Sequence, residues 1–99
     1  MHEHYVMFKL KPEFKDEIRG IVRRLNQLDK EIPAILYSEV LVDELQGHNS
    51  YDLMYHIRVG SLDVFKKDYM QNPTHVLLQK YIESRVCGIA DIDVAMKDV

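Results

Sequence analysis

His75 is the residue whose type and position best suit acid–base chemistry. It follows the pair Asn72-Pro73, which is typical of a helix start because asparagine caps a helix and proline suits its first turn. The field of the helix start and any burial would both favour the neutral imidazole, which can accept a proton. A histidine with its pKa near the working pH suits removal of a proton next to a carbonyl group. We therefore predict His75 as a catalytic base that acts on a carbonyl compound.

Tyr69 and His4 are the candidates for the partner of this base. A tyrosine hydroxyl or a second imidazole can stabilise the enolate that forms when the proton leaves. The alternative is structural: His75 and Tyr69 would hydrogen-bond each other or a break between two helices, and would only hold its geometry. Aromatic and aliphatic side chains would line a pocket beside these groups, although stripes of such residues usually mean core packing. They are Phe8, Leu10, Tyr55, Phe65 and Tyr81.

The segment His2-Glu3-His4 has the residue types of a metal site but not the arrangement. Alternate side chains of a strand point to opposite faces, so Glu3 would lie opposite the two histidines, and two ligands make a weak site. We predict no metal there and no cofactor elsewhere, because the chain has no glycine-rich phosphate loop, no CxxC pair and no tryptophan. The single cysteine, Cys87, lies among small and apolar neighbours and is expected to be buried and inert.

Length and composition indicate one ordinary globular domain over residues 1–99. The chain is 46% hydrophobic and 29% charged, and 99 residues are too few for two independent cores. Its formal charge of −3 and its pI of about 5.9 give no electrostatic footprint for nucleic acid, so no such partner is expected. Its apolar runs are far shorter than the roughly 20 residues of a membrane-spanning helix. We predict no membrane association and a cytoplasmic location.

Hydrophobic spacing changes along the chain in the order strand, helix, strand, strand, helix, strand. Strands show apolar residues at every second position, and helices show them at every third or fourth. Pro12 and Pro33 bound the first helix, and Asn72-Pro73 divides the second helical region in two. The expected strands are 4–10, 34–43, 51–59 and 88–96, and the later helical pieces begin at Ser61 and Asn72.

This βαββαβ order predicts an α+β, ferredoxin-like domain in which both helices lie on one face of a four-stranded antiparallel sheet. The first two strands carry large apolar residues on both faces, and an exposed patch of that size usually marks an interface. We therefore expect a homodimer in which the open faces of two sheets pack together and close into a barrel. His48 and His56 are interpreted as a polar loop residue and a polar strand residue.

Four pieces of the sequence together resemble the stress-responsive α/β-barrel (Dabb) family. They are HYVMFKLK (4–11), YDL (51–53), YMQNPTH (69–75) and an acidic residue in the last strand. Each piece is short, but their order and spacing agree, and the resemblance spans nearly the whole chain. The resemblance implies a dimeric α+β barrel. Some plant members are polyketide cyclases that carry out an intramolecular aldol closure, and the positions that carry over are Tyr69, His75 and His4. Many relatives have a second histidine where this chain has Asn72.

Two classes of function remain open. The first is an enzyme or binder that acts, without a prosthetic group, on a small apolar, aromatic or polyketide-like carbonyl compound in a pocket between the sheet and the helices. It would be a cofactor-independent enzyme that is cyclase-like, lyase-like or, as a distant third possibility, monooxygenase-like. The second is a non-catalytic protein of assembly or protection under stress. A real cavity at His4, Tyr69 and His75 would favour the first class, and a filled interior the second.

Overall fold

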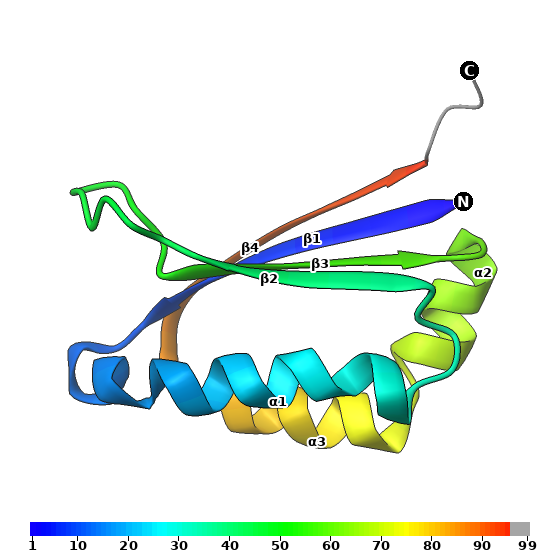
Figure 1. The fold of residues 1–99 in the computed structure, drawn as a ribbon, viewed down its shortest axis with the longest axis horizontal. Helices are drawn as coiled ribbons and strands as arrows, with labels where there is room; N and C mark the ends of the chain where they lie inside the picture. The colour runs from blue at the N-terminus through cyan, green and yellow to red at the C-terminus, as the bar shows by residue number, and fades with distance from the viewer. Residues whose placement is uncertain (96–99) are drawn as a thin grey trace.

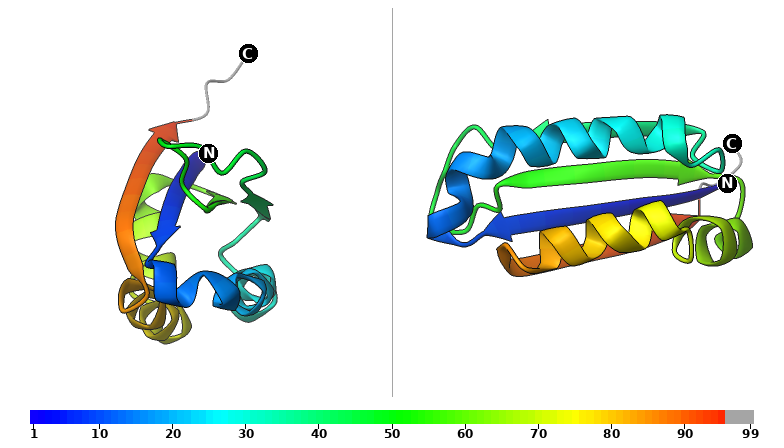
Figure 2. Two further views of the ribbon diagram at one scale, coloured as in Figure 1. Left: turned by 90° about the vertical axis from the view of Figure 1, so that its left-hand side faces the viewer. Right: turned by 90° about the horizontal axis from the view of Figure 1, so that it is seen from below.

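The computed structural model describes residues 1–95, which form a four-stranded antiparallel sheet with its long helices on one face (Figures 1 and 2). The strand order across the sheet is β2-β3-β1-β4. This is the predicted α+β, ferredoxin-like topology. The elements are β1 (His2–Leu10), the 3₁₀-helix η1 (Pro12–Glu17), α1 (Ile18–Glu31), β2 (Tyr37–Val42), β3 (Leu53–Val59), α2 (Leu62–Val64), the π-helical turn η2 (Phe65–Tyr69), α3 (Pro73–Glu83) and β4 (Val86–Ala95).

The first helix lies on the sheet through one apolar stripe. Its buried residues, Ile21, Leu25 and Leu28, are spaced by four and three, so they share one side of the helix. The helix ends before Pro33, and the amide of Ile32 still donates to the carbonyl of Leu28 at 2.8 Å. No helix within residues 1–95 has both the length and the apolar character needed to cross a bilayer.

The second helical region is broken in two, as predicted, and each piece has its own cap. Ser61 Oγ accepts from the amide of Val64 at 3.1 Å, and Asn72 Oδ1 accepts from the amide of Thr74 at 2.9 Å. Between these caps the backbone widens into the π-helical turn η2, where the amide of Met70 donates to the carbonyl of Phe65 at 2.9 Å. The break places Tyr69, the last residue of η2, beside the start of α3.

The core lies between the inner face of the sheet and the helices. Alternate residues of β1 and β3 point into it, including Leu10, Tyr55 and Ile57, and the helices add Ile21, Leu25 and Leu28. Tyr55 and Ile57 are at most 1% exposed. Dense burial on these two central strands fixes the register of the sheet, because a one-residue slip would move every core side chain to the other face.

The bounds of all four strands differ from those expected. β1 begins at His2 because its partners β3 and β4 both extend that far, and the loop between β2 and β3 removes the expected residues 43, 51 and 52 from these strands. β2 begins at Tyr37 because the chain leaving α1 first makes a turn, in which the amide of Ile35 donates to the carbonyl of Ile32 at 3.1 Å. β4 begins at Val86, and Met96, the expected end of the last strand, lies outside the described residues. The expectation of a buried Cys87 is wrong. It lies exposed on the edge strand β4, where the pairing with β1 shifts register, so that Lys9 and Leu10 pair with Gly88 and Val86.

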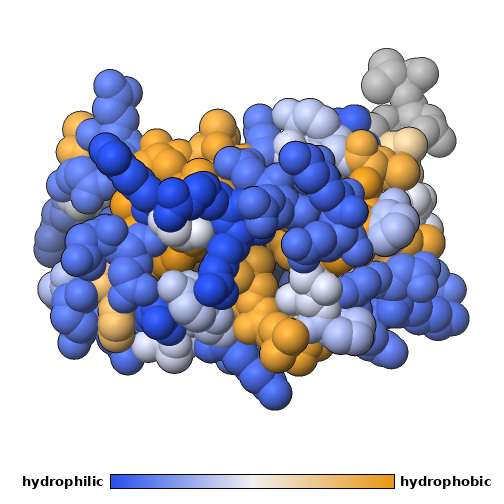
Figure 3. Space-filling view, turned by 60° about the horizontal axis from the view of Figure 1, so that its bottom comes forward, coloured by the Kyte–Doolittle hydropathy of each residue, from blue (hydrophilic) through white to orange (hydrophobic). Residues whose placement is uncertain are grey.

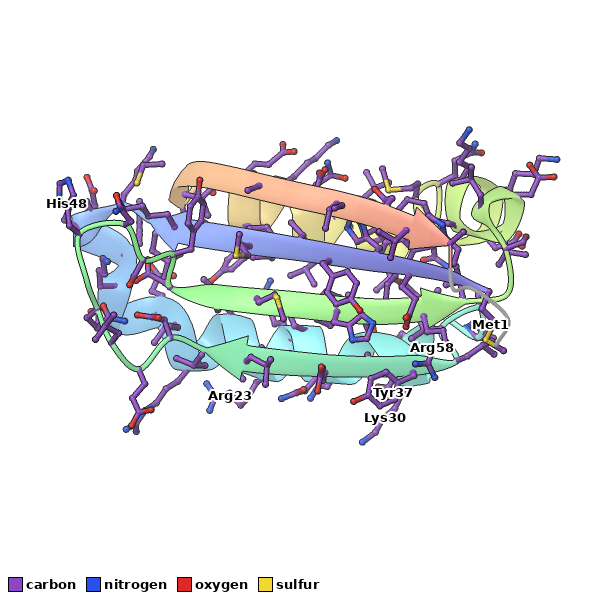
Figure 4. The ribbon with its side chains drawn as sticks, turned by 90° about the horizontal axis from the view of Figure 1, so that it is seen from above. Met1, Arg23, Lys30, Tyr37, His48 and Arg58 are labelled. Carbon is purple, nitrogen blue, oxygen red and sulfur yellow. The ribbon has the colours of Figure 1, made fainter. Side chains whose placement is uncertain are left out.

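The face of the sheet away from the helices combines apolar side chains with a buried polar network (Figure 4). Its exposed apolar residues are Met7, Tyr37, Leu41, Ile92 and Val94. On its two central strands, toward the end where β1 begins, Glu3 Oε1 accepts from Arg58 Nε at 2.9 Å and lies 3.0 Å from His56 Nε2. His56 lies on a strand, as expected, but it is only 6% exposed. The ring of Tyr5 stacks on it with 4.2 Å between the ring centroids.

Candidate functional site

A cavity of about 120 Å³ lies between the inner face of the sheet and α3, partly open to solvent. Its wall includes His4 from β1, Tyr69 from η2 and His75 from α3, the three residues predicted to do the chemistry. The other lining residues are mainly apolar: Val6, Phe8, Leu25, Leu28, Tyr55, Met70, Leu78, Gln79, Ile82, Glu83, Ile89 and Asp91. In Figure 3, which looks onto the helix side, hydrophobic side chains reach the surface between hydrophilic ones.

His75 has one nitrogen in a hydrogen bond, and the other makes none within residues 1–95 and can accept a proton. Its Nδ1 lies 3.2 Å from the carbonyl oxygen of Met70. A carbonyl can only accept, so Nδ1 carries the hydrogen and Nε2 keeps its lone pair. Burial lowers the pKa of His75, an effect opposed by the bond to Met70 and reinforced by nearby His4. The imidazole is therefore held in the neutral form that a base requires.

Tyr69 presents a protonated hydroxyl beside this base. The ring is 3% exposed, and its centroid lies 4.3 Å from that of His75 and 5.4 Å from that of Phe65. Burial raises the pKa of the Tyr69 hydroxyl above its usual range, and neighbouring Tyr55 adds to the rise. The hydroxyl therefore keeps its proton at neutral pH and can donate a hydrogen bond to a developing oxyanion.

His4 is oriented by a carboxylate that sequence reasoning did not assign to the site. Asp93 Oδ1 lies 2.8 Å from His4 Nδ1 and 2.9 Å from His2 Nε2. Because a carboxylate only accepts, Nδ1 of His4 carries a hydrogen. Phe65 packs against both imidazole rings, at 4.8 Å from His4 and 5.0 Å from His2. The pairing of His4 with Asp93 between β1 and β4 brings these residues together.

Asp93 was visible in the sequence only as an acidic residue of the last strand. The alternation of β4 places it on the same face as Asp91, but the partner strand and the register come from pairing across more than 80 residues. Local spacing cannot supply that register. His4, Tyr69 and His75, which the sequence singled out, line one cavity, and the carboxylate that orients His4 was not among the predicted residues.

The five predicted lining residues divide into two groups. Phe8 and Tyr55 line the cavity, and the Tyr55 hydroxyl is fully buried, with Ser38 nearby but outside hydrogen-bond geometry. The other three lie outside the lining. Leu10 is core at the far end of β1, Phe65 is covered by His2, His4 and Tyr69, and Tyr81 bonds Glu17 at 3.0 Å beneath the guanidinium of Arg85.

Glu3 lies on the opposite face of the sheet from His2 and His4, as alternation along the strand predicts. Its carboxylate is bound to Arg58 and His56 and does not join the two histidines. Within residues 1–95, no three His, Cys, Asp or Glu side chains are grouped so that they could hold a metal ion.

Solved structures with this fold include two dimeric ferredoxin-like proteins of unknown function and one lyase. The protein from Thermobifida fusca is 18% identical over 96% of this chain and 90% of its own, with a TM-score of 0.84. The one from Bacteroides fragilis is 22% identical over 96% and 95%, with a TM-score of 0.80. The hydroxynitrile lyase from Passiflora edulis is 14% identical over 99% and 94%, with a TM-score of 0.86. At these identities the similarity shows the fold alone.

No curated protein sequence matches the chain. The family model of the stress-responsive A/B barrel domain matches residues 3–96, which confirms the resemblance carried by the four sequence pieces. The chain therefore belongs to the stress-responsive A/B barrel domain family.

Proposed function

We propose that this chain binds a small aromatic or polyketide-like carbonyl compound and converts it by acid–base chemistry of His75, Tyr69 and His4, without a prosthetic group. The observation that carries the proposal is the convergence of these three side chains on one cavity, where Nε2 of His75 makes no hydrogen bond with the part of the chain that the structure describes. A neutral base, a protonated hydroxyl and an oriented second imidazole are the groups that enolate chemistry needs.

The first step would transfer one proton. His75 Nε2 takes the hydrogen from the carbon next to the carbonyl, the C–H bonding electrons form the enolate, and its charge develops on the carbonyl oxygen. Tyr69 Oη donates a hydrogen bond to that oxygen. His4 can add a second from Nε2 only in its imidazolium form, because its Nδ1 already donates to Asp93. If the enolate carbon then attacks a second carbonyl of the same molecule, the new alkoxide recovers the proton from His75, which returns to its neutral form.

The fold is compatible with small-molecule chemistry, since a hydroxynitrile lyase of Passiflora edulis shares it. At 14% identity that protein supports the fold only, so the proposed activity depends on the site. The apolar wall formed by Phe8, Leu78 and Ile82 favours an aromatic or aliphatic body for the compound.

Hydrogen–deuterium exchange tests the proposed step without knowledge of the natural substrate. In deuterated buffer, the native chain should accelerate exchange of the methyl protons of acetophenone, followed by NMR. His75→Ala should lower the enzymatic rate about a hundredfold, which is the usual contribution of a general base. His48→Ala, a change in the exposed loop, should leave the rate unchanged. Exchange no faster than in buffer, or equal rates for native chain and His75→Ala, would contradict the proposal.

One observation favours the non-catalytic alternative. The bond from His75 to the carbonyl of Met70 crosses the break between η2 and α3, so it also holds that break together. In a purely structural role, His75→Ala would remove the bond to Met70 and lower the free energy of unfolding, while the rate of acetophenone exchange would equal that of the native chain. Urea unfolding of this variant beside the exchange measurement separates the two functions.

We also propose a homodimer formed by the open faces of two sheets, in a stress-responsive protein of the cytoplasm. The dimer is supported by the exposed apolar side chains on that face and by the dimeric state of the neighbours from Thermobifida fusca and Bacteroides fragilis. A cytoplasmic location fits a sequence with one cysteine and no long apolar run.

A further inference from the structure

The charges that line the cavity have one sign. Among its described lining residues the charged side chains are Glu83 and Asp91, and neither lysine nor arginine is present. Asp91 lies opposite Val6 on the inner face of the edge strand β4, two residues before Asp93. It makes no hydrogen bond or ion pair with any residue of 1–95. Gln79 Nε2 donates to Glu83 at 2.9 Å, which leaves that carboxylate its full negative charge.

The nearby imidazoles do not reverse this sign. His2 and His4 both contact the carboxylate of Asp93, whose negative charge offsets one added proton on this pair. His75 is the third imidazole, and burial holds its pKa below the ordinary value. Around pH 8 His75 is therefore neutral, and the negative charges at the cavity opening are those of Glu83 and Asp91.

The volume limits what can be enclosed. An engineered cavity of about 150 Å³ in another protein holds one benzene molecule, so about 120 Å³ is the space of roughly one ring. A larger ligand would extend past the exposed residues Glu83 and Asp91. Any charge on that extending part would lie beside the two carboxylates.

From this arrangement we infer that the cavity selects compounds that are uncharged or cationic and bury about one ring, and that Asp91 and Glu83 discriminate against anions such as carboxylates and phosphate esters. The inference rests on the proposed function and names its substrate class. Two unit charges about 4 Å apart in water interact by about 1 kcal/mol, so each exposed carboxylate can weaken binding of an anion about fivefold. Salt reduces the effect, because both side chains are exposed.

Three probes of nearly the same shape isolate the charge: benzamide is neutral, benzamidine cationic and benzoate anionic. Their dissociation constants for the native chain would be measured at pH 8 and low salt by titration of its ¹⁵N-labelled amide spectrum. Benzamide and benzamidine should each bind at least about fivefold more tightly than benzoate. The double variant Asp91→Asn with Glu83→Gln should bring benzoate within about twofold of benzamide.

A matched control removes the same charge elsewhere. Glu13→Gln with Glu44→Gln changes two exposed carboxylates outside the cavity lining and should preserve the native ratio of benzamide to benzoate affinity. Benzoate binding as tightly as benzamide to the native chain, or a ratio unmoved by the Asp91 and Glu83 changes, would overturn the inference. Failure of all three probes to bind would instead overturn the proposed function, and the inference with it.

Discussion

The hydrogen bond between His75 and the carbonyl of Met70 determines what the site can do at the scale of single residues. It assigns the hydrogen to Nδ1 and leaves Nε2 as the accepting atom. Tyr69 stays protonated because its ring is buried, so the two groups have opposite roles although their rings are only 4.3 Å apart. Environments that push the pKa values of adjacent groups apart are the usual way in which a base and a hydrogen-bond donor coexist at one pH.

The lowered pKa of His75 predicts how activity and stability change in acid. Because the pKa of His75 lies below its ordinary value of 6.5, the imidazole is still mostly neutral at pH 6.5. The exchange rate should therefore begin to fall in acid only below pH 6.5. The unfolded chain binds a proton near pH 6.5 and the folded chain binds it only at lower pH. Stability should therefore fall as the pH drops through this range.

Urea unfolding at several pH values between 5 and 8 measures the predicted loss of stability in acid. His75→Gln should flatten the pH dependence of the unfolding free energy near pH 6, and His48→Gln should leave it as in the native chain. An inflection of activity above pH 7 would contradict the assignment of His75 as a neutral base.

Asp93 is predicted to act through His4 rather than on the substrate. Asp93→Asn keeps the shape but replaces a charged acceptor with a neutral amide, so His4 loses the partner that fixes its tautomer. The exchange rate should fall about tenfold or more. Asp93→Glu should restore part of it and return the pH profile toward that of the native chain. A rate equal to the native one in Asp93→Asn would exclude this positioning role.

At the scale of elements, the break between η2 and α3 brings Tyr69 and His75 together. Its geometry depends on the cap of Asn72, whose side chain accepts from the amide of Thr74. Asn72→Ala should lower the free energy of unfolding by about 1 kcal/mol, the usual value of an N-cap. Gln71→Ala, an exposed neighbour that caps nothing, should change it by less than about 0.5 kcal/mol. Equal losses in urea titrations of the two variants would contradict the role of the cap.

Local patterns predicted this break and the element order, because caps, prolines and apolar spacing act within a few residues. They also predicted that Glu3 and the two neighbouring histidines lie on opposite faces. They did not predict the exposure of Cys87 or the role of Asp93, since both depend on β4 being an edge strand paired only with β1 in a particular register. They also did not predict that Phe65 and Tyr81 lie outside the cavity lining, because side-chain rotamers direct these rings to other partners.

At the scale of the whole molecule, the open sheet face should form the dimer. Ile92 is 59% exposed at the centre of β4, so Ile92→Lys would place a charge in the proposed interface. The dissociation constant should rise at least about tenfold, which light scattering after size exclusion can measure. Leu77→Lys makes the same change at a residue of α3 that is 70% exposed, and should leave the mass of the native assembly unchanged. A native chain that is monomeric at high micromolar concentration would contradict the dimer.

A crystal structure of the native chain with acetophenone bound tests the proposed active site most directly. We expect the ring in the cavity beside Phe8 and Leu78, with the carbonyl oxygen within about 2.6–3.2 Å of Tyr69 Oη or His4 Nε2 and the methyl carbon facing His75 Nε2. A carbonyl turned away from all three groups, or a cavity closed by its own side chains at saturating acetophenone, would contradict the assignment of this cavity as a carbonyl-binding active site.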